Sequence, residues 1–273
     1  MTSTLMTDDN FEDFDDFTEQ LDYELLEKGR NLSDVEYANG SWIAVLNDGP
    51  DSTWSTNPDV EELEGQIEAR WEQGYKLTDV EYGDGVWFAS FEKGISSDSN
   101  YTYTDDPDEF AEQIQELGDG GLYRGYDFVD VEYGDGVWFG VLNDGLGGST
   151  YRSANTDELL ATNIEDLQEQ GYDLVDVEYT GGGWVSVFYD DSGVVDSDYA
   201  IGNSASEFGQ QIEQKLDEGY DLVDIEYGNG TWVGVFDGVI AGTDSNSDST
   251  PSVDQILIDG TIDSLLRETY PIS

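Results

Sequence analysis

Ten acidic residues recur in pairs along the chain, and they are the residues whose type and spacing could do chemistry. Each pair has the form Asp-x-Glu and stands in a repeated phrase such as DFVDVEYGDGVWFGVLND, residues 127–144. Because alternate residues of a strand point to the same face, the Asp and Glu of a pair share one face of their strand. The candidate metal-binding residues are therefore Asp34, Glu36, Asp79, Glu81, Asp130, Glu132, Asp176, Glu178, Asp224 and Glu226.

These ten carboxylates allow two interpretations. If the five copies surround one axis with this strand innermost, the ten groups converge on a ring that could bind a hard cation, Ca²⁺ or Mg²⁺, through oxygen. Alternatively, each Asp accepts hydrogen bonds from the backbone or a helix N-terminus of a neighbouring unit, and each Glu faces solvent. Repeated residues in repeat proteins usually serve the contact between units.

The composition excludes most other site chemistry. The chain has no His and no Cys, so the common nucleophile–base pairs and most transition-metal sites are absent, and we predict no catalytic residue and no certain cofactor. A glycosidase-like hydrolase would need two carboxylates across a sugar-sized cleft, and nothing singles out one pair among 63 Asp and Glu.

The repeated phrase itself predicts a β-hairpin. The expected turns have two central residues that tolerate positive φ, as a type I′ turn requires. The pairs are Asn39-Gly40, Asp84-Gly85, Asp135-Gly136, Gly182-Gly183 and Asn229-Gly230. We predict five hairpins, at about 31–47, 76–92, 127–143, 173–189 and 221–237. The turn sets Tyr133 opposite Trp138 and Glu132 opposite Phe139.

A third strand and a helix follow each hairpin in the pattern. Asn57-Pro58, Asp106-Pro107 and Thr250-Pro251 read as an N-cap followed by proline at the first helical position, and apolar residues then recur at helical intervals. A further helix over about 14–26 precedes the first hairpin. The spacing of the hairpin tyrosines, 45 to 51 residues, is that of a repeat architecture.

We therefore predict an α/β repeat protein in which an N-terminal helix is followed by five βββα units. A propeller-like ring is the expected shape, and an open curved α/β array is the alternative. Six helices for five sheets leave one helix unmatched. Residues 1–10 are expected to form an acidic flexible tail, and residues 11–273 a single repeat domain.

The order of helix, Gly-Tyr, Leu-Val-Asp-Val, turn and aromatic-rich strand resembles bacterial tandem-repeat modules that often accompany hydrolase domains of the β-lactamase type. It is also similar to a repeat domain of unknown function behind plant casein-kinase-like kinase domains. The similarity rests on residues 171–177 with their counterparts at 219–225 and 74–80. It implies a propeller-like α/β repeat fold and no established activity.

The charge composition limits the classes of function that the chain could have. Nine Lys and Arg stand against 63 Asp and Glu, a formal net charge of −54. Screening by salt relieves such self-repulsion, so we expect a non-enzymatic interaction or scaffold module adapted to high salt, with a protein partner. The scarcity of basic residues argues against direct DNA or RNA binding, whereas mimicry of nucleic-acid charge stays an alternative. No signal peptide or membrane span is predicted, so the expected location is the cytoplasm of a salt-adapted organism or its virus; the oligomeric state is left open.

Overall fold

The structure, a computed structural model, describes residues 3–7, 14–38, 40–94, 98–118, 126–144, 148–180, 182–189 and 196–238. Within these ranges the chain forms five similar units, each with one helix and a three-stranded antiparallel sheet. No described helix has the length and apolar character needed to cross a membrane.

Each unit runs in the order outer strand, helix, inner strand, middle strand. The outer strands are β1 (Thr4–Thr7), β4 (Ser52–Asn57), β7 (Ser99–Thr104), β10 (Ser149–Ala154) and β13 (Asp196–Gly202). The helices are α1 (Phe14–Leu26), α2 (Val60–Glu72), α3 (Pro107–Gly118), α4 (Asp157–Gln168) and α5 (Ala205–Glu218). The inner strands are β2 (Arg30–Ala38), β5 (Tyr75–Gly83), β8 (Tyr126–Gly134), β11 (Asp173–Tyr179) and β14 (Tyr220–Gly228). The middle strands are β3 (Ser41–Asp48), β6 (Val86–Lys93), β9 (Val137–Asp144), β12 (Trp184–Tyr189) and β15 (Thr231–Gly238).

The five predicted hairpins are confirmed as the inner and middle strands, with the predicted register. In the third unit Tyr133 pairs with Trp138 and Glu132 with Phe139. Asp84, Asp135 and Asn229 have positive φ, and so do the glycines that follow them, as type I′ turns require. In the fourth unit the Thr180 amide donates to the Gly183 carbonyl, so Gly183 lies outside the turn and the predicted central pair is one residue too late.

The helix starts are confirmed in part. Pro107 begins α3, and Asp106 caps it by accepting a hydrogen bond from the Asp108 amide. In α2 the cap is Asp59 instead of Asn57, because the Asp59 side chain accepts from the Glu61 amide. The third predicted start, at 250–251, lies outside the described residues.

The boundaries of the predicted units are corrected by the strand pairing. The strand after each hairpin pairs with the next middle strand, so β4 joins β6 and the contiguous unit is βαββ rather than βββα. Thr4–Thr7, predicted to belong to a flexible tail, pair with β3 instead and bury Leu5 and Met6. The helix before the first hairpin, α1, thus belongs to the first unit, and the sixth expected helix lies outside the described residues.

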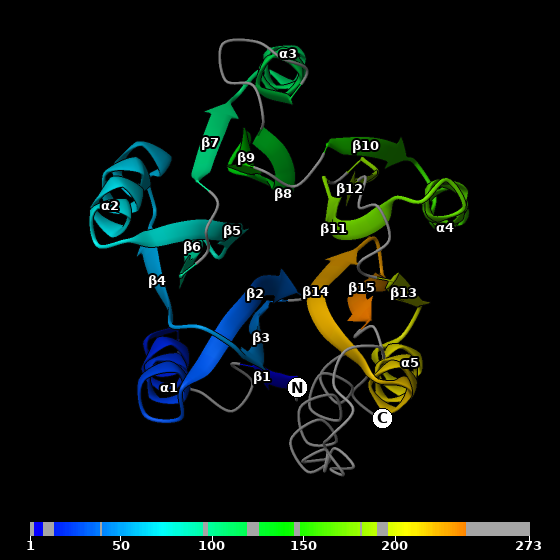
Figure 1. The fold of residues 1–273 in the computed structure, drawn as a ribbon, viewed down its shortest axis with the longest axis horizontal. Coiled ribbons are helices and arrows are strands. Elements are labelled where there is room, and N and C mark those ends of the chain that lie inside the picture. The colour runs from blue at the N-terminus through cyan, green and yellow to red at the C-terminus, as the bar shows by residue number, and fades with distance from the viewer. Residues whose placement is uncertain are drawn as a thin grey trace, which may run out of the picture.

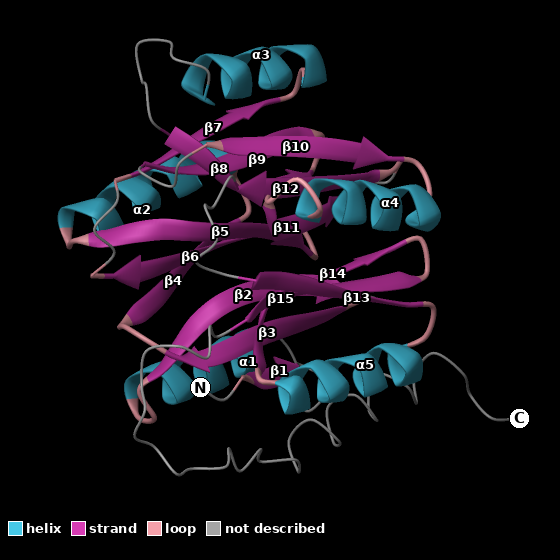
Figure 2. Ribbon diagram, turned by 45° about the vertical axis from the view of Figure 1, so that its right-hand side comes forward, coloured by secondary structure: helices cyan, strands magenta, loops and turns pink. Residues whose placement is uncertain are grey.

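The five units are placed around a common centre, with the inner strands nearest the centre and the helices at the periphery (Figure 1). In a view turned by 45°, most strands run across the picture, with α3 at the upper edge of the molecule and α1 and α5 at the lower edge (Figure 2). Each inner strand contacts that of the next unit, and β14 of the fifth unit contacts β2 of the first.

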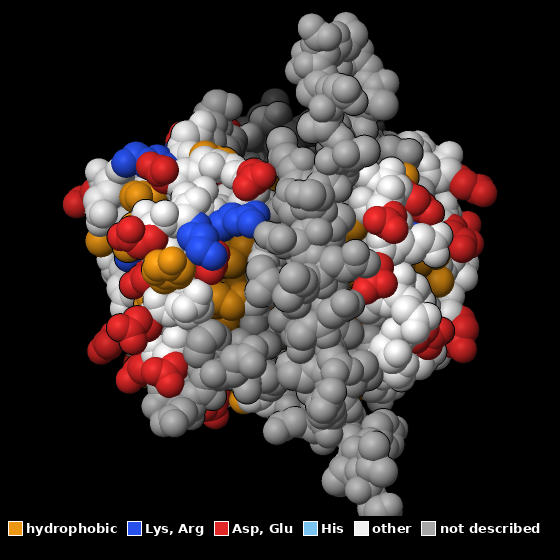
Figure 3. Space-filling model, turned by 90° about the horizontal axis from the view of Figure 1, so that it is seen from below, with side chains coloured by type: hydrophobic (Ala, Val, Ile, Leu, Met, Phe, Trp, Pro, Cys, Tyr) orange, Lys and Arg blue, Asp and Glu red, His pale blue; other side chains and the backbone are white. Residues whose placement is uncertain are grey.

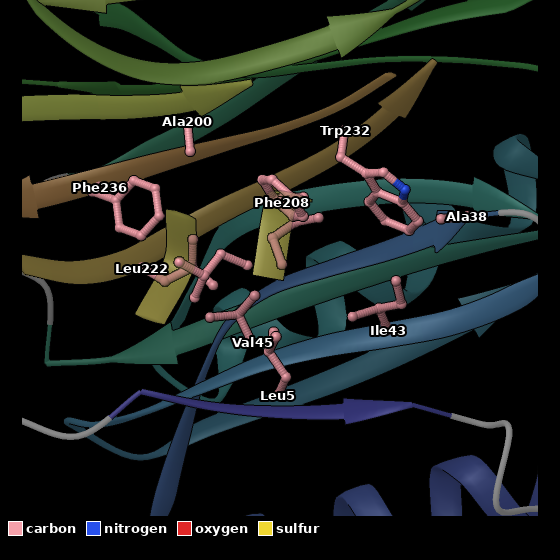
Figure 4. Packing of buried hydrophobic residues seen from close by; sticks show 11 residues of the cluster. Leu5, Ala38, Ile43, Val45, Ala200, Phe208, Leu222, Trp232 and Phe236 are labelled. Carbon is pink, nitrogen blue, oxygen red and sulfur yellow. The ribbon is translucent and has the colours of Figure 1, made fainter. Parts of the chain in front are cut away.

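The core consists of five clusters, each shared by two units. One sheet face packs on its own helix, and it also meets the opposite face of the next sheet. In the second unit Leu63 and Ile67 of α2 pack on Trp87 together with Phe139 and Val141 of the third unit. The fifth unit meets the first in the same way, with Leu222 and Phe236 packed against residues of the first unit such as Ile43 and Val45 (Figure 4). Burial of apolar surface therefore holds neighbouring units together, the last and the first included.

Candidate functional site

The ten predicted carboxyl groups converge at the centre of the molecule. All ten line one cavity of about 20 Å³, together with Val35, Val80, Val131, Val177 and Ile225 of the same inner strands. Eight of them are exposed by only 4 to 8% of their surface, and Asp79 and Asp224 are half-buried. The ten residues that the sequence singled out thus line a single cavity.

An irregularity in every inner strand aims these side chains. The register of β8 against β9 shifts between Phe128 and Asp130, and the equivalent shift occurs in β2, β5, β11 and β14. A bulge adds one residue to the strand, so Phe128 and Val131, three residues apart, both pack into the core cluster around Phe110. Asp130 and Glu132 then point toward the preceding unit.

Each Asp of the ring accepts a hydrogen bond from a backbone amide of the preceding unit. The Val80 amide donates to Asp130 Oδ2 at 2.9 Å, and the Ile225 amide of the fifth unit donates to Asp34 Oδ2 of the first at 3.1 Å. The same bond joins Val131 to Asp176, Val177 to Asp224 and Val35 to Asp79. The structural interpretation of the Asp residues is thus confirmed at all five contacts.

The Glu residues do not face solvent, and that part of the structural interpretation is wrong. Glu81 Oε1 accepts from the Tyr37 amide at 3.1 Å, and Glu226 Oε1 accepts from the Tyr179 amide at 3.3 Å. The carboxyl groups of Glu36 and Glu178 also accept backbone hydrogen bonds, from Tyr227 and Tyr133. The free edge of an inner strand needs partners for its amides, and these side chains supply them.

Five serines complete this pattern, and none of them was predicted from the sequence. Each stands at or just before the start of an outer strand and accepts from an amide of the preceding unit, as Ser52 Oγ does from Leu32 at 2.8 Å. The other pairs are Leu77 to Ser99, Phe128 to Ser149, Leu174 to Ser197 and Leu222 to Ser3. The motif Ser-x-aromatic, as in Ser52-Thr53-Trp54, recurs before four of the helices and could have signalled them.

Burial dominates the electrostatics of the ring. Desolvation raises the pKa of every one of the ten carboxyl groups, and repulsion between them raises most of these pKa values further. Desolvation raises the pKa of Asp79 to about 7, and it also raises the pKa of Glu178 to about 7.

The prediction that these residues bind Ca²⁺ or Mg²⁺ is not supported by their geometry. Among the residues that the structure describes, no group of three or more Asp or Glu is arranged so that it could hold a metal ion. The carboxyl groups are instead engaged with the backbone, because nine of the ten accept a hydrogen bond from an amide of a neighbouring unit.

A larger and more open pocket, of about 580 Å³, lies between α4 and β13. Of its acids, Asp157 accepts from Trp184 Nε1 at 2.9 Å and from Thr231 Oγ1 at 2.7 Å, and Asp198 is paired with Lys215. Two of the three carboxylates in this pocket are thus engaged in structural contacts.

Comparison with known proteins gives no further guide to function: no protein-family model matches the chain, and no curated protein matches it. The resemblance to bacterial tandem-repeat modules therefore stays a prediction.

Proposed function

We propose that this chain is a non-enzymatic interaction or scaffold module adapted to high salt. The observation that carries the proposal is the use of the ten repeated acids, which line a cavity of about 20 Å³ and of which nine accept hydrogen bonds from amides of neighbouring units. Sites for small molecules usually measure roughly 300–1,000 Å³. The residues whose type and spacing best suit them to chemistry are therefore engaged in joining the units.

The same contacts favour a closed, propeller-like ring over an open array. In an open array the first and fifth units would be ends, with free edges and uncovered apolar faces. Instead, Asp34 and Ser3 of the first unit accept from amides of the fifth, and Asn47 Nδ2 donates to the Leu222 carbonyl at 3.1 Å. The bonds of Asp34 and Ser3 repeat the pattern found between the other units.

The surface supports salt adaptation more than mimicry of a nucleic acid. On the face seen in Figure 3, Asp and Glu are scattered over both sides of the described surface, while Lys and Arg gather in small groups. A mimic of nucleic acid should instead present its acids in spaced stripes. Scattered acids are what general adaptation to a salt-rich medium requires.

Thermal unfolding across a KCl series tests the salt adaptation. The Debye length falls from about 10 Å at 0.1 M to about 3 Å at 1 M salt, so the melting temperature should rise steeply over this range. Sucrose at matched osmolality is the control for preferential exclusion. A melting temperature that stays level across the KCl series contradicts the proposal.

A hydrolase assay tests the non-enzymatic part. Glu158 lines the 580 Å³ pocket, which is the more open of the two pockets described above. Chromogenic glycosides and esters should show no turnover at molar KCl beyond that of the Glu158→Gln variant. Turnover that disappears in this variant would identify a carboxylate-based hydrolase instead.

A further inference from the structure

The carboxyl ring concentrates acid groups without any basic partner. Its ten members come from the inner strands β2, β5, β8, β11 and β14, and among the described residues no Lys or Arg forms an ion pair with them. The other titratable or polar groups against the ring are Ser90 of β6, whose hydroxyl donates to Asp79, and Tyr189 of β12, which lies near Asp176. Neither group carries positive charge.

The space at the centre has room for about one water-sized ion, which is too few to balance ten charges. A cavity needs roughly 10–15 Å³ to hold one water molecule, and the ring encloses about 20 Å³. At an effective dielectric constant of about 20, two like charges 4 Å apart repel by about 4 kcal/mol. Ten ionised groups would therefore drive the five units apart.

Contacts among the acids indicate how the charge is reduced. The side chain of Glu178 lies within hydrogen-bonding reach of those of Glu132 and Glu226, and Glu226 lies within the same reach of Glu36. Two ionised carboxylates are both acceptors only, so a hydrogen bond between two carboxyl groups requires a proton on one of them. Four of the five Glu residues thus lie next to one another, where a shared proton would replace the repulsion between two neighbours by a hydrogen bond.

The bonds to the neighbouring units permit this protonation. A protonated carboxyl keeps one oxygen as an acceptor and gains an O–H donor. It can therefore accept the backbone amide of the preceding unit and donate to an adjacent carboxyl group at the same time.

We propose that shared protons hold the carboxyl ring together, so that joining the five units takes up protons and a rise in pH loosens the joints. The inference does not depend on the proposed scaffold function. The charges are neutralised by protons that the ring binds on folding, in place of a metal ion.

The pKa directions agree with this geometry and set the sign of the effect. Burial raises the pKa of all ten groups above their values in an unfolded chain, which are about 4. The folded state therefore holds more protons than the unfolded state above pH 4. The stability from these groups is complete below that pH and is lost as the pH rises through the folded pKa values, which are about 7 for Asp79 and Glu178.

A direct test is infrared spectroscopy at pH 7 in molar KCl, where surface charge is screened. Exposed Asp and Glu are ionised at this pH, and Asp237, whose pKa burial raises to about 6, is mostly ionised. The C=O stretching band of protonated carboxylic acids should therefore come chiefly from the ring. We expect this band in the folded protein and its loss on unfolding in urea at the same pH. Absence of the band from the folded protein overturns the proposal, whether or not any variant folds.

A matched pair of variants localises the protons. Asp130→Asn with Glu132→Gln removes two ring carboxyls and keeps an acceptor oxygen for the Val80 amide that Asp130 binds. The control, Asp166→Asn with Glu169→Gln, removes two exposed carboxyls from the end of α4. The unfolding constant changes about tenfold per pH unit for each extra proton held by the folded state. Between pH 5 and 8 the unfolding constant of the wild type should rise, and that of the ring variant should rise by a factor at least about ten times smaller. The surface variant should follow the wild type.

Two results contradict the proposal. One is an equal pH dependence in the ring variant and the surface variant. The other is stabilisation at pH 8 by millimolar CaCl₂, beyond that of KCl at matched ionic strength and lost in the ring variant, which would assign the charge balance to cations.

Discussion

A glycine in one unit allows a tyrosine of the preceding unit to pack directly against its backbone. A Cβ atom placed on Gly134 would lie 2.2 Å from Cβ and Cγ of Tyr82. The same approach, at 2.1 and 2.0 Å, brings Tyr37 against Gly83 and Tyr179 against Gly228. None of these glycines has a positive φ. Glycine is therefore required here by the close packing between units and not by the backbone conformation.

Replacing Gly134 with alanine should therefore destabilise the fold by about 1–3 kcal/mol, the usual cost of an overpacked core. Gly65, inside α2, serves as the control, because a Cβ atom placed on it would have nothing within 4 Å. Gly65→Ala should stabilise by about 0.5–1 kcal/mol, because alanine loses less backbone entropy in a helix. Urea unfolding at constant pH and salt measures both, and equal signs for the two changes would contradict the close packing at Gly134.

The identity of the ring residues followed from the sequence, while their partners did not. The Asp-x-Glu repeat and the period-2 rule placed Asp130 and Glu132 on one face. The amide that Asp130 binds, that of Val80, lies in another unit, 50 residues away, and no local rule ranks such partners. The burial of the Glu residues was missed for the same reason, because solvent access depends on the neighbouring unit.

The hairpin turn is the most local element of each unit. Gly136 has φ of +81° and a Cβ atom added there would meet open space, so conformation alone restricts this position. Gly136→Val should cost about 1–3 kcal/mol, because a β-branched residue is strained at positive φ.

Gly136→Asn is the matched variant for that change, since asparagine tolerates the left-handed region. It should lose clearly less stability than Gly136→Val in chemical denaturation. A neutral Gly136→Val would show that this turn is not held in the type I′ conformation.

Prediction at the scale of elements succeeded where contacts are short-range. Turn chemistry and register are set within about ten residues, so all five hairpins were found. The unit boundary was wrong because the strand between a hairpin and the following helix can pair with either hairpin. β4, for example, pairs with β6 beyond the helix α2, a choice made by packing across units.

If the five units form a closed ring, the contact between the fifth and first units should be as strong as the other contacts between units. Val45 of the first unit and Val141 of the third occupy equivalent positions, each fully buried against the preceding unit. Truncation of either to alanine removes buried methyl groups and should cost about 1–3 kcal/mol.

In a closed ring Val45→Ala and Val141→Ala should lower the free energy of unfolding by similar amounts. If the molecule in solution is an open array, Val45 faces water and its truncation should be nearly neutral. Equilibrium unfolding of the two variants in the same buffer separates the two shapes.

The choice between ring and array could not be made from the sequence, because both use the same units. It depends on whether the sheet of the fifth unit packs against the sheet of the first. From the sequence, Val45 and Phe236 are predicted only as apolar positions of strands. Their contact appears once the sheets are placed in space (Figure 4).

The contact between the fifth and first units also bears on how the protein is made. It joins Asp34 to Ile225, 191 residues later, whereas the contact between the first and second units joins Tyr37 to Glu81, 44 residues later. During synthesis from the N-terminus, the face of β3 that carries Ile43 and Val45 leaves the ribosome well before Leu222 and Phe236 exist. A chain terminated before residue 222 keeps that apolar face uncovered, so premature termination yields an aggregation-prone product instead of a smaller working one.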